Sequence, residues 1–332
     1  MEKTISNKKY YSWIDFAKVF GLYMVTLGHG TLLTSKYTMI IYSFHMPFFF
    51  MLSGMLYNKR SITDTVKKSW HSLIIPYLLI NLICLVYYTI YSYRHSDDLL
   101  NVSLGRIGAI LMGLGYNVEN WTPVSTPLWF VAALLYIQYM MAMAKNRMQE
   151  IILLLLSFVV TFIILILNID TYPPIDSAFM AFPFFYFGYI LKDYIMLKKI
   201  KISIIIFIFF IWLSLVWLNG RSDIAVCQYG NNLFLFYIIG FCGSFSFISI
   251  FSRINSFNHL GAVNQLSKGT MIMMGFNVLA VFWAEYLFNK FIPYYQESGF
   301  RGIVIGGVVM IFFYPIVKLS SLYFPALLGY RK

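Results

Sequence analysis

The sequence predicts an all-α protein that crosses a membrane many times, and its composition and hydropathy carry this prediction. Apolar residues make up 60% of the 332 and charged residues only 11%, whereas a soluble domain carries roughly 25% charge. Mean hydropathy is +0.72, and apolar runs of the ~20 residues that a spanning helix needs recur along the chain. No hydrophilic stretch is long enough for a second domain, so residues 1–332 are expected to form a single membrane domain.

About ten segments are predicted to span the membrane. Residues 103–116 are too short to span and contain Arg106, so they are expected to form an interfacial or re-entrant helix within the largest outer loop, 94–125. The first run holds Asp15 and Lys18 and is followed by no small-residue cleavage site, so it is not expected to be a cleaved signal peptide. The predicted spans are 11–32, 38–57, 70–93, 126–144, 150–168, 178–191 (short, with a possible extension into "LKDY"), 202–219, 231–251, 270–288 and 302–324.

The basic residues predict the orientation of these spans. With the N-terminus inside, 17 of the 25 Lys and Arg residues fall on the inner side and 6 on the outer side, as the positive-inside rule requires. Both termini are therefore expected to be cytoplasmic, and the net charge of +12 reflects topology rather than nucleic-acid binding. A positive inner face suits anionic lipid headgroups and would equally attract a soluble phosphorylated donor.

The three cysteines, Cys84, Cys227 and Cys242, all lie in or beside apolar runs. Their spacing matches no metal-ligand pattern and offers no evident pair. We expect neither a disulfide nor a metal site.

The first span, "WIDFAKVFGLYMVTLGHG", carries polar groups that lipid disfavours. Lys18 and His29 are 11 residues apart, so in a helix they share a face to within ~20° and lie ~16 Å apart. Asp15 precedes Lys18 by three positions and can pair with it. Ionisable groups at such depth usually face a cavity or one another and indicate function. The alternative is an ion pair that fixes helix packing, beside a histidine satisfied by a nearby carbonyl.

The second span, "YSFHMPFFFMLSGMLY", brings a second imidazole to a similar depth. His29 lies shortly before a short connection and His45 shortly after it, so the two rings can approach one another. Pro47 frees a backbone carbonyl nearby, and Gly54 permits close helix contact. Two histidines at matched depth favour a catalytic or binding role for at least one of them.

Five stretches follow one another as in a known family: "WIDFAKVFGLYMVTLGHG", "FHMPFFFMLSGMLY", "IIPYLL", "PLWFVAALL" and "FPFFYFGYILKDY". In this order they resemble the acyltransferase-3 family of integral membrane acyltransferases, from about residue 13 to 195 and weakly onward to about 280. The resemblance implies transfer of an acyl group, usually acetyl, from cytoplasmic acyl-CoA to a sugar hydroxyl of capsule, O-antigen, exopolysaccharide or a lipid-linked precursor. It also implies a multi-pass protein of a bacterial cytoplasmic membrane.

The chain departs from the family pattern at two places. Members often carry an Arg-rich pair before the "IPY" of the third span, where this chain has Lys67, Lys68 and His71. These residues would then have to bind the CoA phosphates, the lysines as point charges. Members also often have a histidine late in the ninth span, where this chain has Asn277, which can still form hydrogen bonds.

The implied chemistry assigns roles to the polar residues of the first two spans. His29 would act as general base on the hydroxyl, or the acyl group would pass through a covalent acyl-histidine. His45 or Asn277 would orient the base or polarise the thioester oxygen. Lys18 would neutralise donor charge or hold Asp15.

Three further residues are weaker candidates for binding donor or acceptor. Trp129 in "PLWF" can line a channel, although a buried aromatic is the more common outcome. Glu285 can be a carboxylate near the acceptor or can reach the membrane interface. Glu119 lies in the outer loop, where acids and aromatics suit sugar hydroxyls and ring faces but an ordinary solvated loop explains them too. His95 and His259 are expected to be solvated.

A transporter or flippase for a glycan or lipid-linked sugar is the alternative, because buried charges around a central cavity suit it as well. The absence of a detectable inverted repeat and the ordered motifs count against it.

Overall fold

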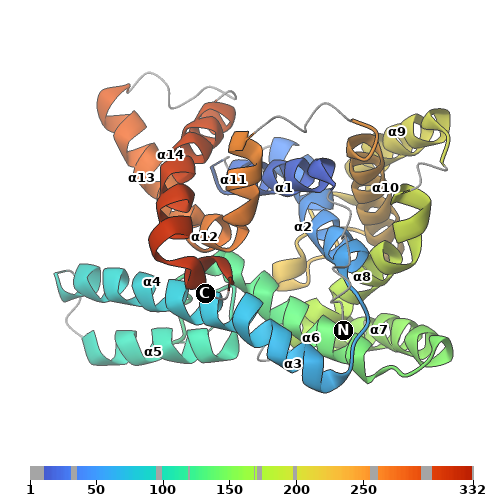
Figure 1. The fold of residues 1–332 in the computed structure, drawn as a ribbon, viewed down its shortest axis with the longest axis horizontal. Helices are drawn as coiled ribbons and strands as arrows, with labels where there is room; N and C mark the ends of the chain where they lie inside the picture. Colours follow the sequence, from blue (N-terminus) through green and yellow to red (C-terminus); the bar gives the residue numbers. More distant parts are fainter. Residues whose placement is uncertain are drawn as a thin grey trace, which may run out of the picture.

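The computed structural model describes residues 11–30, 36–94, 99–118, 120–167, 169, 174–196, 200–254, 261–292 and 301–330. These residues form helices joined by short connections (Figure 1), and no strand occurs among them. The elements are α1 (Ser12–Gly30), α2 (Lys36–Leu56), α3 (Ile62–Ser69), the π-helical η1 (Trp70–Ile74), α4 (Ile75–Tyr93), α5 (Leu99–Met112), η2 (Thr126–Leu128), α6 (Trp129–Met143), α7 (Arg147–Leu167), α8 (Ile175–Met196), α9 (Ile202–Asn219), η3 (Ile224–Val226), α10 (Leu233–Phe251), α11 (Gly261–Lys268), α12 (Thr270–Gly275), α13 (Asn277–Phe291), α14 (Arg301–Tyr323) and η6 (Pro325–Leu328).

The prediction of an all-α, multi-pass membrane bundle is confirmed. In the part of the chain that the structure describes, seven helical segments are long and apolar enough to cross a membrane. They correspond to seven of the ten predicted spans, namely Lys36–Leu56, Ile62–Tyr93, Thr126–Met143, Arg147–Leu167, Ile202–Asn219, Leu233–Phe251 and Arg301–Tyr323.

The other three predicted spans are helical but less apolar or shorter. α1 has 19 residues, and Asp15, Lys18 and His29 lower its hydropathy. α8 has 22 residues and does extend through "LKDY", well beyond 178–191. The ninth predicted span is not one helix, because it divides into α12 and α13 at Phe276.

The predicted interfacial helix at 103–116 exists, but it lies four residues earlier, as α5. Its 14 residues are too few to span, as expected. Arg106 points back to the bundle, where it donates hydrogen bonds to the Tyr88 carbonyl (2.8 Å) and to the Ser92 hydroxyl (2.9 Å) of α4. These bonds, rather than lipid headgroups, satisfy its guanidinium and hold α5 beside α4.

The third span begins earlier than predicted. α3, η1 and α4 form one continuous helical segment from Ile62 to Tyr93, started by an N-cap at Ser61 whose hydroxyl accepts from the Asp64 N–H at 3.1 Å. The π-helical turn Trp70–Ile74 precedes Pro76. π-helical turns are rare in proteins, but many of them occur at functional sites. This one begins two residues after Lys68.

α2 and α8 form the closest helix pair of the bundle. A Cβ atom at Gly54 would overlap the Phe185 carbonyl, and one at Gly188 would overlap the Met51 carbonyl. The two backbones therefore meet at a pair of facing glycines, which confirms the close contact predicted for Gly54. This contact holds α2, and with it His45, against the centre of the molecule.

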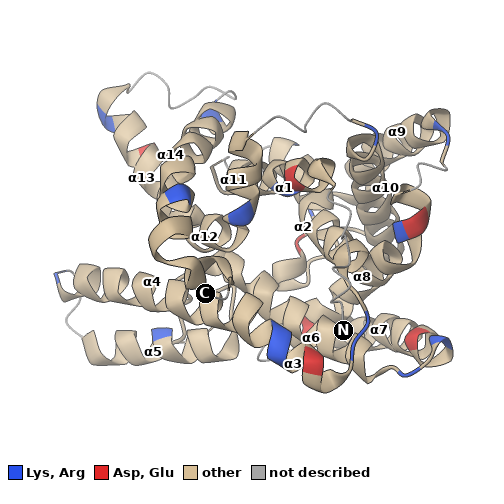
Figure 2. Cartoon of the chain, viewed as in Figure 1, with Lys and Arg blue, Asp and Glu red and all other residues tan. Residues whose placement is uncertain are grey.

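Charged residues are sparse on the helices (Figure 2), and polar contacts occur at both predicted sides of the bundle. On the predicted inner side, Glu150 at the start of α7 binds both Lys59 and Arg147, and Lys192 donates to Asn58 at 3.4 Å. We call Lys59, Arg147 and Glu150 the inner cluster. On the predicted outer side, Ser177 donates to the Ile224 carbonyl at 3.0 Å. At both predicted sides, polar contacts therefore tie neighbouring elements together.

Candidate functional site

A cavity of about 120 Å³ lies between α1 and α2, at the end where the predicted outer loops meet. Its walls come from α1, α2, the segment before α6, the loop between α9 and α10, and the end of α12. The residues that line it are Val25, His29, Tyr42, His45, Met46, Gly115, Thr126, Pro127, Trp129, Asp223, Ala225, Val226 and Met274. The structure therefore brings together His29, His45 and Trp129 of the predicted site.

The two imidazoles line this cavity and lie close enough to interact electrostatically. His45 is buried, and its Nδ1 is 2.9 Å from the Ile41 carbonyl one turn earlier. A carbonyl only accepts, so Nδ1 of neutral His45 carries the hydrogen and Nε2 keeps its lone pair. Within the described ranges, the His29 ring has no hydrogen-bond partner.

The cavity also contains a tyrosine and a carboxylate that the sequence analysis did not select. The Tyr42 ring meets the His45 ring edge to face at 4.8 Å, and Gly28, next to His29, leaves room for Tyr42 against α1. The Arg221 guanidinium lies over the Tyr42 ring, 5.0 Å from the ring centre.

Asp223 comes from the loop between α9 and α10. Burial raises the pKa of its carboxyl to about 6, while the Ala225 N–H and Arg221 act in the opposite direction.

The break between α12 and α13 borders the cavity. Met274 lines it, and Gly275 packs so closely on Ile80 that a Cβ atom would clash. The Ser125 hydroxyl donates to the Gly275 carbonyl at 2.7 Å, which satisfies a backbone group at the break. Discontinuous helices are tolerated in membranes where protein groups satisfy the backbone, and they often form binding sites.

Asn277 begins α13 and is buried outside the cavity lining. Its side-chain N–H donates to the Thr26 hydroxyl of α1 at 2.7 Å, and Thr26 in turn donates to the Leu22 carbonyl at 2.9 Å. Thr26 lies three positions before His29, on the same side of α1. Asn277 therefore holds the turn of α1 that carries His29, and does not line the cavity itself.

Asp15 and Lys18 lie toward the other end of α1, away from the cavity lining. Asp15 accepts hydrogen bonds from Ser267 (2.5 Å) and Asn264 (3.3 Å) of α11, and it also interacts electrostatically with Lys18. The polar residues predicted to share a face of this helix thus separate: Asp15 and Lys18 lie at the inner end, where Asp15 binds α11, and His29 lies at the cavity. Lys18 is half-buried.

The predicted donor residues lie on the third span, outside the cavity lining. Lys67 and Lys68 are exposed on α3, and His71 is half-buried in η1. Thr65 and Ser69 of α3 are buried instead, and Ser69 shares a hydrogen bond of 3.1 Å with Tyr139 of α6. The two lysines are therefore available to a soluble ligand on the predicted inner side.

The remaining predicted acceptor residues do not join the cavity. Glu285 of α13 pairs with Arg301 of α14, with 3.9 Å between Oε1 and Nη2. Glu285 thus links neighbouring helices, and the two roles considered for it stay predictions. Glu119 lies outside the described residues.

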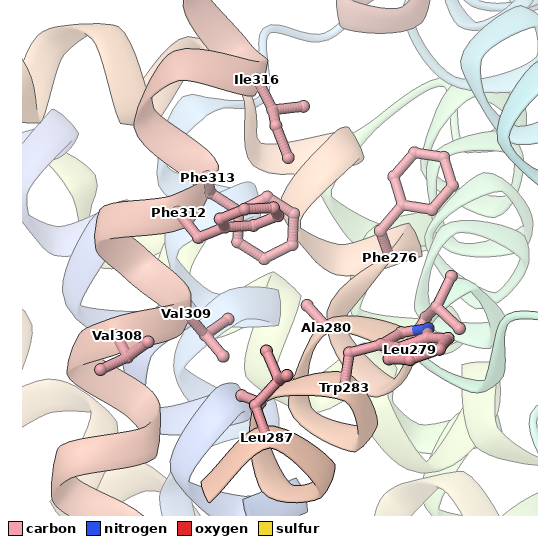
Figure 3. Close-up of a pocket in the computed structure, with 11 residues that line it drawn as sticks. Phe276, Leu279, Ala280, Trp283, Leu287, Val308, Val309, Phe312, Phe313 and Ile316 are labelled. Carbon is pink, nitrogen blue, oxygen red and sulfur yellow. The ribbon is translucent and has the colours of Figure 1, made fainter. Parts of the chain in front are cut away.

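A larger hollow between α13 and α14 carries no chemistry of this kind. Its volume is about 430 Å³, and its lining is apolar along the full length (Figure 3). Among the described residues, its lining includes no carboxylate, imidazole or hydroxyl group.

The family model described as an acyltransferase domain matches residues 11–320, nearly the whole chain. The chain belongs to the acyltransferase-3 family. It is therefore a multi-pass membrane acyltransferase, and the cavity with two imidazoles is its candidate active site. The comparisons with curated proteins and with solved structures give no match.

Sequence reasoning missed three residues of this site: Tyr42, Asp223 and Ser125. The signal for Asp223 was an acid in a short loop, "GRSDIAVCQYG", with a glycine at each end. Such a loop can fold back over the bundle, but only the long-range contacts show that it does.

Proposed function

We propose that this acyltransferase moves an acyl group, most simply acetyl, from cytoplasmic acyl-CoA to a hydroxyl of a cell-surface carbohydrate or its lipid-linked precursor. The proposal rests on one observation above all: two imidazoles line one cavity in a chain of this family. Capsule, O-antigen and exopolysaccharide are the acceptors that the family resemblance implies, and we therefore infer a bacterial cytoplasmic membrane.

In the proposed reaction, the hydroxyl oxygen attacks the thioester carbonyl carbon. A C–O bond forms, the C–S bond breaks, and the hydroxyl proton passes to an imidazole and then to the leaving thiolate. A positioned base accelerates such a step by ~10²–10⁴-fold. His29 is the first candidate, because no hydrogen bond within the described chain competes for its ring.

His45 supports His29 in this proposal. Its Nδ1–H is held by the Ile41 carbonyl, so Nε2 of neutral His45 remains as an acceptor in a ring that lines the shared cavity. An acceptor hydroxyl between the rings can then be oriented by one imidazole and deprotonated by the other. A covalent acyl-histidine is the other route, and it would form on the same two residues.

The size of the cavity fits the reacting groups and not the whole donor. Sites for drug-sized ligands occupy ~300–1,000 Å³, whereas this cavity measures about 120 Å³. CoA would therefore remain outside with only its acyl end inserted. Lys67, Lys68 and His71 would bind its phosphates, and Lys18 would line the path between them and the cavity.

The proposal is tested with purified protein, labelled acetyl-CoA and glycan from the cell surface of the native host. We expect label on the glycan, released by mild base as an ester. Transport of glycan into vesicles without transfer of label would instead support a flippase.

A further inference from the structure

The loop between α9 and α10 is built as a rigid cover for the outer side of the cavity. Asp223 and Gln228 exchange two backbone hydrogen bonds, of 2.7 and 2.9 Å, and close the short turn η3. The Asn219 amide donates to the Tyr229 carbonyl at 2.7 Å and accepts from the Asn232 N–H at 2.9 Å. Ser177 of α8 ties η3 to the bundle through the Ile224 carbonyl.

This rigid loop directs a carboxylate into the cavity. Asp223 accepts one hydrogen bond, from the Ala225 N–H at 3.0 Å, and forms no ion pair with another described residue. The cavity is also lined by His29, His45 and Tyr42, and the Arg221 guanidinium lies over the Tyr42 ring and interacts electrostatically with Asp223 without forming an ion pair. A carboxylate with a single backbone donor has unused acceptor capacity, which is costly to bury unless a ligand uses it.

A ligand with hydroxyl groups can donate the hydrogen bonds that the Asp223 carboxylate still lacks. An ionised carboxylate accepts strong hydrogen bonds from hydroxyl groups, and the side chains of Tyr42 and Trp129 line the same cavity. Carboxylates and aromatic rings together suit the hydroxyls and the apolar faces of a sugar. The same carboxylate would repel a CoA phosphate, so the phosphates of the donor are not expected to bind on the side of the cavity that carries Asp223.

We propose that Asp223 binds the carbohydrate acceptor, accepting a hydrogen bond from one hydroxyl so that a neighbouring hydroxyl faces His29 and His45. This inference rests on the proposed function. It assigns selection of the carbohydrate acceptor to the side of the cavity that carries Asp223. The acceptor enters from the predicted outer side, under the loop 220–232, and the acyl end of the donor comes from the opposite side.

The test compares Asp223→Asn with wild type in the labelled transfer assay, using host glycan as acceptor. Asparagine keeps the shape of the side chain and removes its charge. Loss of a hydrogen bond to a charged group is expected to raise the acceptor KM by roughly 10–100-fold. The acetyl-CoA KM is expected to change by less than about twofold, and Asp223→Glu is expected to restore part of the acceptor affinity.

Asp193→Asn is the matched control, because Asp193 is exposed near the predicted inner end of α8. It should keep both KM values. A well-folded Asp223→Asn protein with an unchanged acceptor KM overturns the inference, and so does an equal rise of both KM values. Wild-type protein that transfers no label overturns the proposed function instead. If Asp223→Asn fails to fold, the acceptor KM of Asp223→Glu against wild type decides in the same way.

Discussion

The two ends of the bundle treat their polar groups differently. In the inner cluster, the buried carboxylate of Glu150, with only 4% of its side chain exposed, is bound by both Lys59 and Arg147. At the outer cavity, His29 and Asp223 have few or no partners in the described chain. Buried charges that are fully paired act in packing, whereas polar groups that line a cavity with unused capacity are available to a substrate. The predictions below test this contrast.

His29→Ala is expected to have the largest effect. Loss of a general base should lower kcat by ~10²-fold or more, while the unfolding temperature stays near that of wild type because the ring faces a cavity. His45→Ala should lower kcat less and should also cost stability, because it removes the bond to the Ile41 carbonyl. Initial rates at saturating acetyl-CoA measure both. His259→Gln is the control, and near-normal turnover of well-expressed His29→Ala would remove His29 from the mechanism.

Glu150→Gln is expected to give the opposite result. It weakens hydrogen bonds to two cations, so we expect a loss of about 1–3 kcal/mol in the free energy of unfolding. The specific activity of the folded fraction should stay within about twofold. Thermal unfolding in detergent, followed by an assay of the surviving protein, measures this. A fall in activity without a fall in stability would show that the inner cluster takes part in the reaction. The inner cluster and the outer cavity would then not differ in function as we expect.

The acceptor step is expected to weaken in acid. Burial raises the pKa of Asp223 to about 6, so the carboxylate is ionised above that pH and protonated below it. The value of kcat/KM for the acceptor should therefore fall toward tenfold per pH unit below about pH 6. His29 on α1, Tyr42 and His45 on α2, Asp176 on α8, and Arg221 and Cys227 on the loop are the other titratable groups around it.

Asp223→Asn separates these groups. It should remove the part of the acid limb near pH 6 and leave any limb that the histidines cause. If the pH profile of the variant has the same shape as that of wild type, a group other than Asp223 causes the fall in kcat/KM in acid.

Lys67 and Lys68 are expected to have the smallest effect. Exposed charge interactions contribute about 0.2–1 kcal/mol each, so Lys67→Gln with Lys68→Gln should raise the acetyl-CoA KM by roughly 2–30-fold. The effect should shrink in high salt, because the Debye length is ~8–10 Å near physiological ionic strength. Lys201→Gln with Lys268→Gln removes two other exposed charges from the predicted inner side and should not change this KM. Equal effects of the two double variants would show that Lys67 and Lys68 do not bind the donor specifically and only add to the positive charge of the predicted inner side.

Local patterns were sufficient to predict most of the fold. Length and hydropathy located the spans, and the similar depths of His29 and His45 predicted that they meet, since a short connection forces neighbouring antiparallel helices. The break at Phe276 was not predictable, because "TMIMMGFNVLAVF" is largely apolar, contains no proline and has only Thr270 and Asn277 as polar side chains. It depends on Ser125, about 150 positions earlier, which satisfies the Gly275 carbonyl.

The site was predictable only where its residues lie on spans. Asp223 has no periodic context, and its place depends on Ser177 and on the turn closed with Gln228. Glu285 looked similar to Asp223 as an acid among aromatics on the outer side, yet it pairs with Arg301. Only tertiary contacts distinguish these two carboxylates.

The facing glycines of α2 and α8 have a consequence for how this enzyme tolerates change. Side chains elsewhere can adjust a contact by rotating, but at Gly54 and Gly188 backbone meets backbone and nothing can rotate. An alanine at either position must push the helices apart and would shift the depth of His45 in the membrane. The depth of His45 is therefore set by a contact of backbone with backbone, which no side-chain rotation at Gly54 or Gly188 can readjust.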